Sequence, residues 1–132
     1  MDPVLHLSIV VADLDEAREF YVDTLGCTPG RVQPDWMDVW FWGLQLTLQQ
    51  RPDQVVGSEH QGVRHFGVTL DTAEFGPLVF RLEARSDLNW VVPVTTEFLG
   101  TPRQQTKGKL ADPSGNVIEI KTYLDPEAAF AR

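Results

Sequence analysis

Two histidines and one glutamate stand in strand-like sequence, each close to apolar residues. They are His6 in LHLSIVV, His65 in RHFGVTL and Glu119 in VIEI. Because strand side chains alternate between two faces, each of the three points away from the apolar row of its own strand. Two imidazoles and one carboxylate form a ligand set for a divalent metal ion. Such an ion can act as a Lewis acid, acidify a bound water or, as Fe(II), activate O₂.

A fourth polar side chain fits the same pattern. Gln45 lies between leucines in LQLTLQ, and an amide oxygen can complete a set of metal ligands. Taken singly, a strand histidine is more often a structural residue, and a strand glutamate or glutamine more often faces solvent. The joint pattern favours a metal site made by His6, Gln45, His65 and Glu119. Glu119 is then the only anionic ligand and the candidate catalytic base.

The turn DPSGN, at residues 112–116, precedes Glu119 and sets its orientation. Gly115 tolerates a positive φ, and the Asp112 side chain can accept hydrogen bonds from backbone groups further along the turn. The chain therefore reverses here. The strand that follows presents Glu119 on the face opposite its two isoleucine neighbours.

Composition and net charge limit which classes of protein and which kinds of partner are plausible. The chain has 132 residues, 42% of them hydrophobic and 23% charged, which is ordinary for one globular domain. The formal net charge of −8 argues against a nucleic-acid or anionic-membrane partner, because phosphate binding needs clustered basic residues. A single cysteine, Cys27, cannot form an internal disulfide. With neither a signal peptide nor a membrane-spanning run recognised, we expect a cytoplasmic protein that binds a small molecule.

The first half of the chain reads as a strand, a helix and three further strands. The strand covers residues 5–11, and the helix begins at Asp13 or Asp15 and ends at Gly26. The buried stripe of the helix is Ala17, Phe20, Tyr21 and Leu25. The three strands are expected at residues 28–32, 37–42 and 44–49.

A polar segment at residues 51–62 interrupts the pattern and is interpreted as a linker, in which Glu59 and His60 are solvated. After it we expect a strand at residues 64–70 and a helix at residues 73–85 with Pro77 in its first turn.

Shorter elements complete the second half. Two short strands are predicted at residues 90–94 and 95–99, with Pro93 at a sheet edge, then a polar loop at 99–107 and a strand at 108–111. The strand at 117–123 follows the turn, and a helical turn is expected at 125–131.

The chain thus repeats strand, helix and about three strands on both sides of the linker. We predict an α+β fold of two βαβββ modules within a single domain, with module 1 at about residues 4–50, the linker at about 51–62, module 2 at about 63–124 and a tail at 125–132. In this repeat His6 corresponds to His65, and Gln45 takes the place of Glu119.

These segments carry a resemblance to a known family. HLSIVVADLDEAREFYVDTLG, RHFGVTL and DPSGNVIEI, in this order and spacing, resemble the vicinal oxygen chelate superfamily of glyoxalase I, bleomycin-resistance proteins, fosfomycin-resistance enzymes and extradiol dioxygenases. The resemblance implies paired βαβββ modules in a cupped mixed β-sheet around a divalent metal, usually with homodimerisation. It assigns ligand roles to His6, His65 and Glu119 and a fourth ligand position to Gln45. The identity of the metal (Fe, Mn, Ni, Zn or Mg) stays open.

Two classes of function follow. The first is a metal-dependent enzyme, either a glyoxalase-like lyase or isomerase or an extradiol-dioxygenase-like oxidoreductase. Fosfomycin-type thiol transfer would need a cationic cluster, for which Arg103, Lys107 and Lys109 are candidates in the polar loop. The second is a metal-free protein that sequesters a planar ligand, as bleomycin-resistance proteins do, through aromatic residues between Trp36 and Trp42. The complete His/His/Glu set favours the enzyme.

Overall fold

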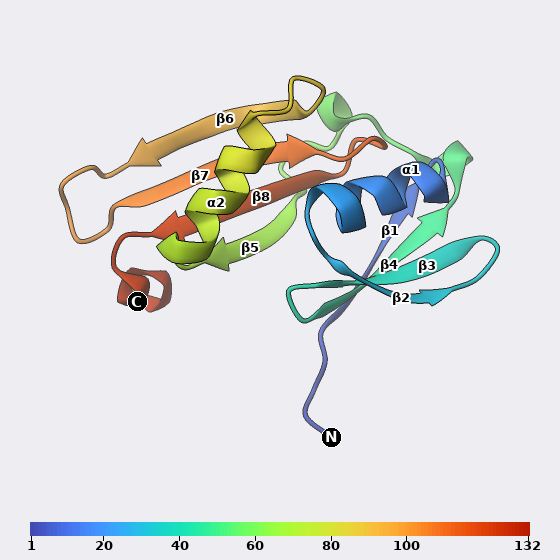
Figure 1. Ribbon diagram of the computed structural model, residues 1–132, viewed down its shortest axis with the longest axis horizontal. Coiled ribbons are helices and arrows are strands. Elements are labelled where there is room, and N and C mark those ends of the chain that lie inside the picture. The colour runs from blue at the N-terminus through green and yellow to red at the C-terminus, as the bar shows by residue number, and fades with distance from the viewer. The chain divides into compact units, whose positions relative to one another are not determined.

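The computed structural model describes all 132 residues and divides into two compact units. The first comprises residues 1–62 together with residues 112–116, and the second comprises residues 63–111 and 117–132. Each unit contains one four-stranded mixed sheet (Figure 1). The predicted α+β class and the repeated βαβββ order are confirmed. No helix in the chain is long and apolar enough to span a bilayer.

The sheet of the first unit has the strand order β1-β4-β3-β2. Its strands are β1 (His6–Val11), β2 (Thr28–Val32), β3 (Trp36–Phe41) and β4 (Leu44–Gln50). Strands β1 and β4 run parallel, and the other neighbours are antiparallel. The segment at 51–62 contains two short 3-10 turns, Pro52–Gln54 and Ser58–His60, and no strand.

Helix α1 (Leu14–Arg18) begins at Asp13, whose side chain accepts a hydrogen bond from the Glu16 backbone amide at 2.9 Å. It continues as a π-helical segment, Glu19–Thr24, and the chain leaves it at Gly26 with φ of +87°. The predicted stripe of Ala17, Phe20, Tyr21 and Leu25 is buried. The helix therefore covers the leucine face of β4, which leaves the alternate polar positions of the strand on the other face.

The second unit has the strand order β5-β8-β7-β6. Its elements are β5 (Phe66–Leu70), α2 (Thr72–Glu83), β6 (Asn89–Glu97), β7 (Gln105–Ala111), β8 (Val117–Tyr123) and a 3-10 turn at Pro126–Phe130. Helix α2 packs on the sheet through Phe75, Leu78, Val79 and Leu82, and Ile118 and Ile120 of β8 are buried with them (Figure 1).

Three sequence predictions for this unit were wrong in detail. Helix α2 begins at Thr72 because Asp71 caps it, so Pro77 lies beyond the first turn. The two short strands expected around Pro93 are one edge strand, β6, whose register shifts on both sides of Val92. Strand β7 begins at Gln105, so the loop is shorter than predicted and Lys107 lies on the strand together with Lys109.

The DPSGN turn forms a buried hydrogen-bond network around Asp112. One carboxylate oxygen of Asp112 accepts from the backbone amides of Ser114 and Asn116, each at 2.9 Å. The other accepts from the Tyr21 hydroxyl at 2.7 Å and from the Asn116 side-chain amide at 2.9 Å. Burial raises the pKa of Asp112, and the hydrogen bonds from Asn116, Tyr21 and Ser114 oppose that shift. Gly115 takes a φ of +88°, as a turn of this kind requires.

Replacing Tyr21 by Phe removes one donor from a buried carboxylate. We expect the free energy of unfolding at neutral pH to fall by about 1.5–3 kcal/mol, as measured by urea denaturation. Tyr123→Phe is the matched control, because no hydrogen bond of the Tyr123 hydroxyl is found, and it should leave stability nearly unchanged.

The loss should depend on pH. The Tyr21 hydroxyl lowers the pKa of Asp112, so the Tyr21→Phe variant, when folded, takes up a proton at higher pH than the parent. The difference in stability is then largest where Asp112 is ionised and shrinks as pH falls through its pKa. A difference that stays constant over that range would contradict the role given to Tyr21.

Candidate metal-binding site

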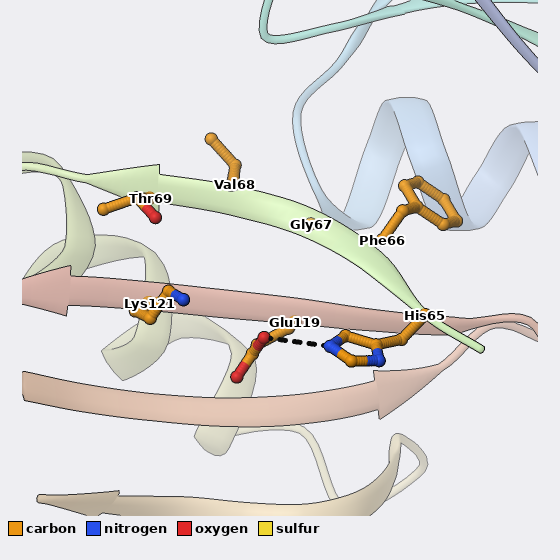
Figure 2. Close-up of a pocket in the computed structure, with 7 residues that line it drawn as sticks. All are labelled: His65, Phe66, Gly67, Val68, Thr69, Glu119 and Lys121. Atoms are coloured by element: carbon orange, nitrogen blue, oxygen red, sulfur yellow. Dashed lines mark hydrogen bonds and ion pairs between the residues drawn. The ribbon is translucent and has the colours of Figure 1, made fainter. Parts of the chain in front are cut away.

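The second unit brings His65 and Glu119 into direct contact. Nε2 of the His65 imidazole lies 3.2 Å from Oε2 of Glu119 (Figure 2). The Glu119 side chain is only 13% exposed, although it points away from the buried isoleucines on either side. The two residues line a pocket of about 200 Å³ together with Phe66, Gly67, Val68, Thr69 and Lys121. The prediction that Glu119 faces away from the core is therefore correct.

A backbone carbonyl determines which nitrogen of His65 carries a proton. Nδ1 lies 2.7 Å from the carbonyl oxygen of Val63. A carbonyl oxygen can only accept a hydrogen bond, so Nδ1 carries the proton and donates it. In the neutral ring, Nε2 then presents a lone pair to the Glu119 carboxylate. Two acceptors at this distance require a positive charge between them, which a proton or a metal ion supplies.

The geometry of this pair suits a metal ion. Nitrogen and oxygen ligands about 2.1 Å from one ion, at angles between octahedral and tetrahedral, lie about 3.0–3.4 Å from each other. The observed separation of 3.2 Å falls in this range. A hydrogen bond from the remote ring nitrogen to a carbonyl is also the usual arrangement behind a metal-ligating histidine. The residues present therefore fit a divalent ion.

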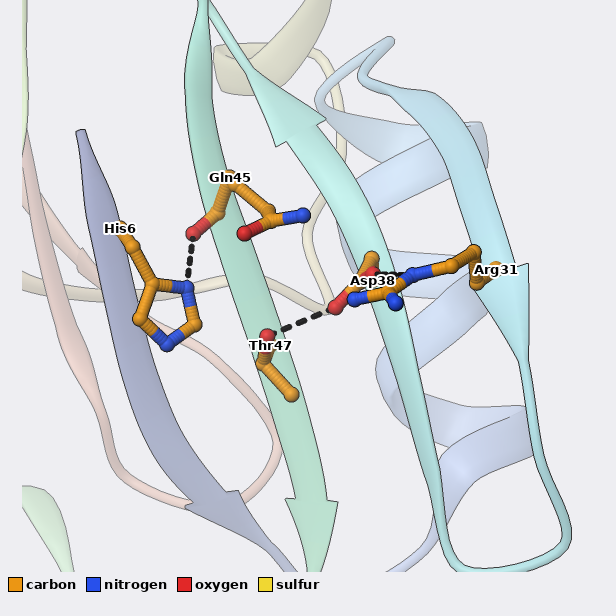
Figure 3. Close-up of polar contacts among 5 residues, drawn as sticks. All are labelled: His6, Arg31, Asp38, Gln45 and Thr47. Atoms are coloured by element: carbon orange, nitrogen blue, oxygen red, sulfur yellow. Dashed lines mark hydrogen bonds and ion pairs between the residues drawn. The ribbon is translucent and has the colours of Figure 1, made fainter. Parts of the chain in front are cut away.

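The first unit contains a similar histidine. His6 lies beside Gln45 on neighbouring parallel strands, and its Nδ1 is 3.2 Å from the backbone carbonyl oxygen of Gln45 (Figure 3). Nδ1 is again the donor, so Nε2 is left available as a ligand. Both predicted histidines thus have the same tautomer fixed in the same way.

The predicted ligands divide between the two units. The first holds His6 and Gln45, the second holds His65 and Glu119, and neither unit alone gathers three or more His, Cys, Asp or Glu side chains that could hold a metal ion. His60 and Glu59 are both at least 70% exposed and 3.7 Å apart, which agrees with their interpretation as solvated residues.

Comparison with known proteins identifies the family. A family model described as the Glyoxalase/Bleomycin resistance protein/Dioxygenase superfamily matches residues 4–120. The chain belongs to this superfamily. A glyoxalase/bleomycin resistance protein/dioxygenase from Alicyclobacillus acidocaldarius is 33% identical, with 96% of each chain covered and a TM-score of 0.82. No match to a curated protein was found.

Two further solved structures show the range of the superfamily. TnmS3, an antibiotic binding protein from Streptomyces sp. CB03234, is 25% identical over 93% of this chain and 97% of its own, with a TM-score of 0.63. The fosfomycin resistance protein FosX from Listeria monocytogenes is 12% identical over 97% and 98%, with a TM-score of 0.72, and shows the shared fold.

Gln45 and Glu119 differ in their register positions relative to the histidines of their own sheets. His6 is directly opposite Gln45, whereas Glu119 is opposite Gly67, two residues beyond His65. The residue of the first unit in the register position of Glu119 is Thr47, which lies opposite Ser8. Counted from the histidines, the positions of Gln45 and Glu119 in the two ladders therefore differ by two residues, and Gln45 and Thr47 lie on the same face of β4.

Sequence analysis missed Asp38, a carboxylate of the first unit on the same face of the sheet as Gln45 and Thr47. Asp38 of β3 is almost fully buried, and its two oxygens accept hydrogen bonds from Arg31 Nε at 2.8 Å and from the Thr47 hydroxyl at 2.7 Å (Figure 3). The signal was available, because Asp38 lies between apolar residues in MDVW just as Glu119 does in VIEI. Asp38 is paired with a guanidinium group, which is always charged, whereas Glu119 contacts the imidazole of His65.

Glycine at position 67 allows β5 to approach β8 beside Glu119. A Cβ atom on Gly67 would lie 1.9 Å from the backbone carbonyl oxygen of Glu119, far inside van der Waals contact. Backbone atoms cannot rotate away, so a side chain at this position must push the two strands apart.

Gly67→Ala should therefore lower the free energy of unfolding by about 1–3 kcal/mol and disturb the contact between His65 and Glu119. Gly76→Ala in α2 is the control, because a Cβ at Gly76 meets nothing within 4 Å and alanine favours a helix. Thermal denaturation of both variants measures the difference. Equal stability of the two variants would show that β5 and β8 separate freely at Glu119.

Proposed function

We propose that this chain is a divalent-metal-dependent enzyme of the superfamily that acts on a small molecule. The proposed ligands are His6, His65 and Glu119, with Gln45 as the fourth. The observation that carries the proposal is the 3.2 Å approach of His65 Nε2 to the Glu119 carboxylate, with His65 Nδ1 held by the Val63 carbonyl oxygen. When bound, a divalent ion would supply Lewis acidity toward a substrate oxygen.

Glu119 is also the proposed proton-transfer group. Only Oε2 contacts His65, so Oε1 remains available to accept a proton from a substrate carbon or oxygen placed in the pocket. The limited exposure of the Glu119 side chain would restrict water around that oxygen and strengthen its interaction with a charged or polar substrate group. Proton transfer of this kind supports lyase or isomerase chemistry as the preferred reaction class.

Metal content tests this proposal directly. Protein purified without added metal, and protein dialysed against Mn²⁺, Ni²⁺, Zn²⁺ or Fe²⁺, should hold about one equivalent of a divalent ion by elemental analysis. His65→Ala and Glu119→Gln should each lower the metal affinity by at least about 100-fold, because each removes a proposed ligand.

The chain offers a matched control for each variant. His60→Ala and Glu59→Gln remove the same functional groups from exposed positions of the first unit and should leave metal affinity unchanged. If Glu119→Gln binds metal as tightly as the parent, or if the parent binds none, the enzyme proposal fails.

The alternative is metal-free sequestration of a planar ligand. Two observations favour it as second candidate: the likeness to the antibiotic binding protein TnmS3, and Trp36 and Trp40 on the β3 face opposite the buried Met37 and Val39. Trp40 is 38% exposed, so part of its indole is open for stacking.

Tryptophan fluorescence separates the two candidates. If the chain sequesters planar ligands, titration with bleomycin should quench the emission equally with and without EDTA, and Trp40→Ala should weaken binding by about tenfold. Trp90→Ala in the second unit is the control. Binding that is absent, or that Trp40→Ala leaves unchanged, would remove sequestration as a candidate.

A further inference from the structure

All three lysines of the chain lie on one face of one hairpin. Lys107 and Lys109 are on β7 and Lys121 is on β8, at alternate positions that share the face of Glu119. Lys107 is directly opposite Lys121, and Lys109 is directly opposite Glu119. Each lysine is half-buried, so its stem lies along the sheet and its ammonium group stays near the surface.

This face carries more positive than negative charge. Lys107 Nζ has a carboxylate partner, Glu97 of β6, at 3.4 Å. Lys121 Nζ lies 5.7 Å from the centre of the Tyr123 ring and has no carboxylate partner. Lys109 faces Glu119 but forms no ion pair with it, because the carboxylate contacts His65 instead. Three ammonium groups therefore accompany two carboxylates, Glu97 and Glu119.

Such an arrangement is unfavourable unless something compensates it. Like charges directly opposite one another on neighbouring strands destabilise a sheet. The chain as a whole has a net charge of −8, with 19 acidic residues available to pair with lysines. Local conflicts of this kind are expected where a residue serves binding rather than folding. A bound divalent ion at His65 and Glu119 would add further positive charge to the same face.

We propose that Lys109 and Lys121 bind an oxyanion, a carboxylate, phosphate or phosphonate group of the small-molecule substrate, on the β7–β8 face beside Glu119. The inference rests on the proposed function, because it names the substrate class for that same site. Lys121 lines the pocket that contains His65 and Glu119 (Figure 2). Lys107, already paired with Glu97, adds long-range attraction.

The position of the anion bears on the reaction. An oxyanion held by Lys109 and Lys121 lies within two strand positions of Glu119, about 7 Å along the strand, which is a length that a small substrate can span. Lysine ammonium groups would orient such a substrate by its charged end and leave its neighbouring carbon or oxygen near Glu119 Oε1. Neutral analogues would lose this orientation.

Titration of the metal-free full chain with inorganic phosphate, methylphosphonate and acetate tests the proposal, with backbone amide NMR shifts of β7 and β8 as the readout at low ionic strength. Lys109→Met and Lys121→Met should each weaken binding of the preferred oxyanion by about tenfold, the loss of one charge-assisted hydrogen bond. Lys109→Arg should retain binding. Arg18→Met is the control for net charge, since Arg18 is an exposed residue of α1 in the first unit.

The outcomes separate this proposal from the enzyme proposal. Loss of oxyanion binding in the two lysine variants, with metal content equal to that of the parent, supports the anion site. No binding of any of the three probes to the parent, or an equal loss in Arg18→Met, overturns it. A parent that binds phosphate through these lysines but holds no metal would overturn the enzyme proposal and leave the anion site standing.

Discussion

The contact between His65 Nε2 and Glu119 Oε2 is the constraint on which the rest of the candidate site depends. The Val63 carbonyl fixes the proton on the other ring nitrogen, so two acceptors face each other at 3.2 Å. The sheet keeps them there because Gly67 allows β5 to approach the backbone of Glu119 and because Ile118 and Ile120 are held in the core. A positive charge between the two groups satisfies both.

The DPSGN turn immediately precedes the strand that carries Glu119 and is anchored by the hydrogen bonds of Asp112. Asp112 accepts four hydrogen bonds, and one comes from Tyr21, which belongs to the buried stripe of the helix near the N-terminus. Residues 112–116 therefore belong to the first unit, although the strands on either side belong to the second. Because side chains alternate along β8 and Ile118 and Ile120 are buried, Glu119 occupies the opposite face of the strand that follows this turn.

Strand alternation made much of this predictable from sequence. A carboxylate that lies between two isoleucines must occupy the face opposite to them, so the orientation of Glu119 follows from local pattern alone. The same holds for a histidine that alternates with apolar residues. The lysines could not be placed in the same way. Lys107 lies in polar sequence that reads as a loop, and only the pairing of β7 with β8 shows that the strand begins at Gln105 and that Lys107 and Lys109 share the face of Glu119. The contact of His65 with Val63 depends on the turn before β5, and the register of Gln45 and of Glu119 depends on the strand ladders, so neither follows from alternation.

The two units share a plan but differ in how their carboxylates are paired. In the first unit the buried Asp38 carboxylate forms an ion pair with Arg31 and accepts a hydrogen bond from the Thr47 hydroxyl. In the second unit Glu119 contacts the His65 imidazole and forms no ion pair with Lys109 opposite it, and of the three lysines only Lys107 has a carboxylate partner. The contact of Glu119 with His65 alone, beside lysines that have few carboxylate partners, is the arrangement that the proposed cation and anion sites of the second unit require.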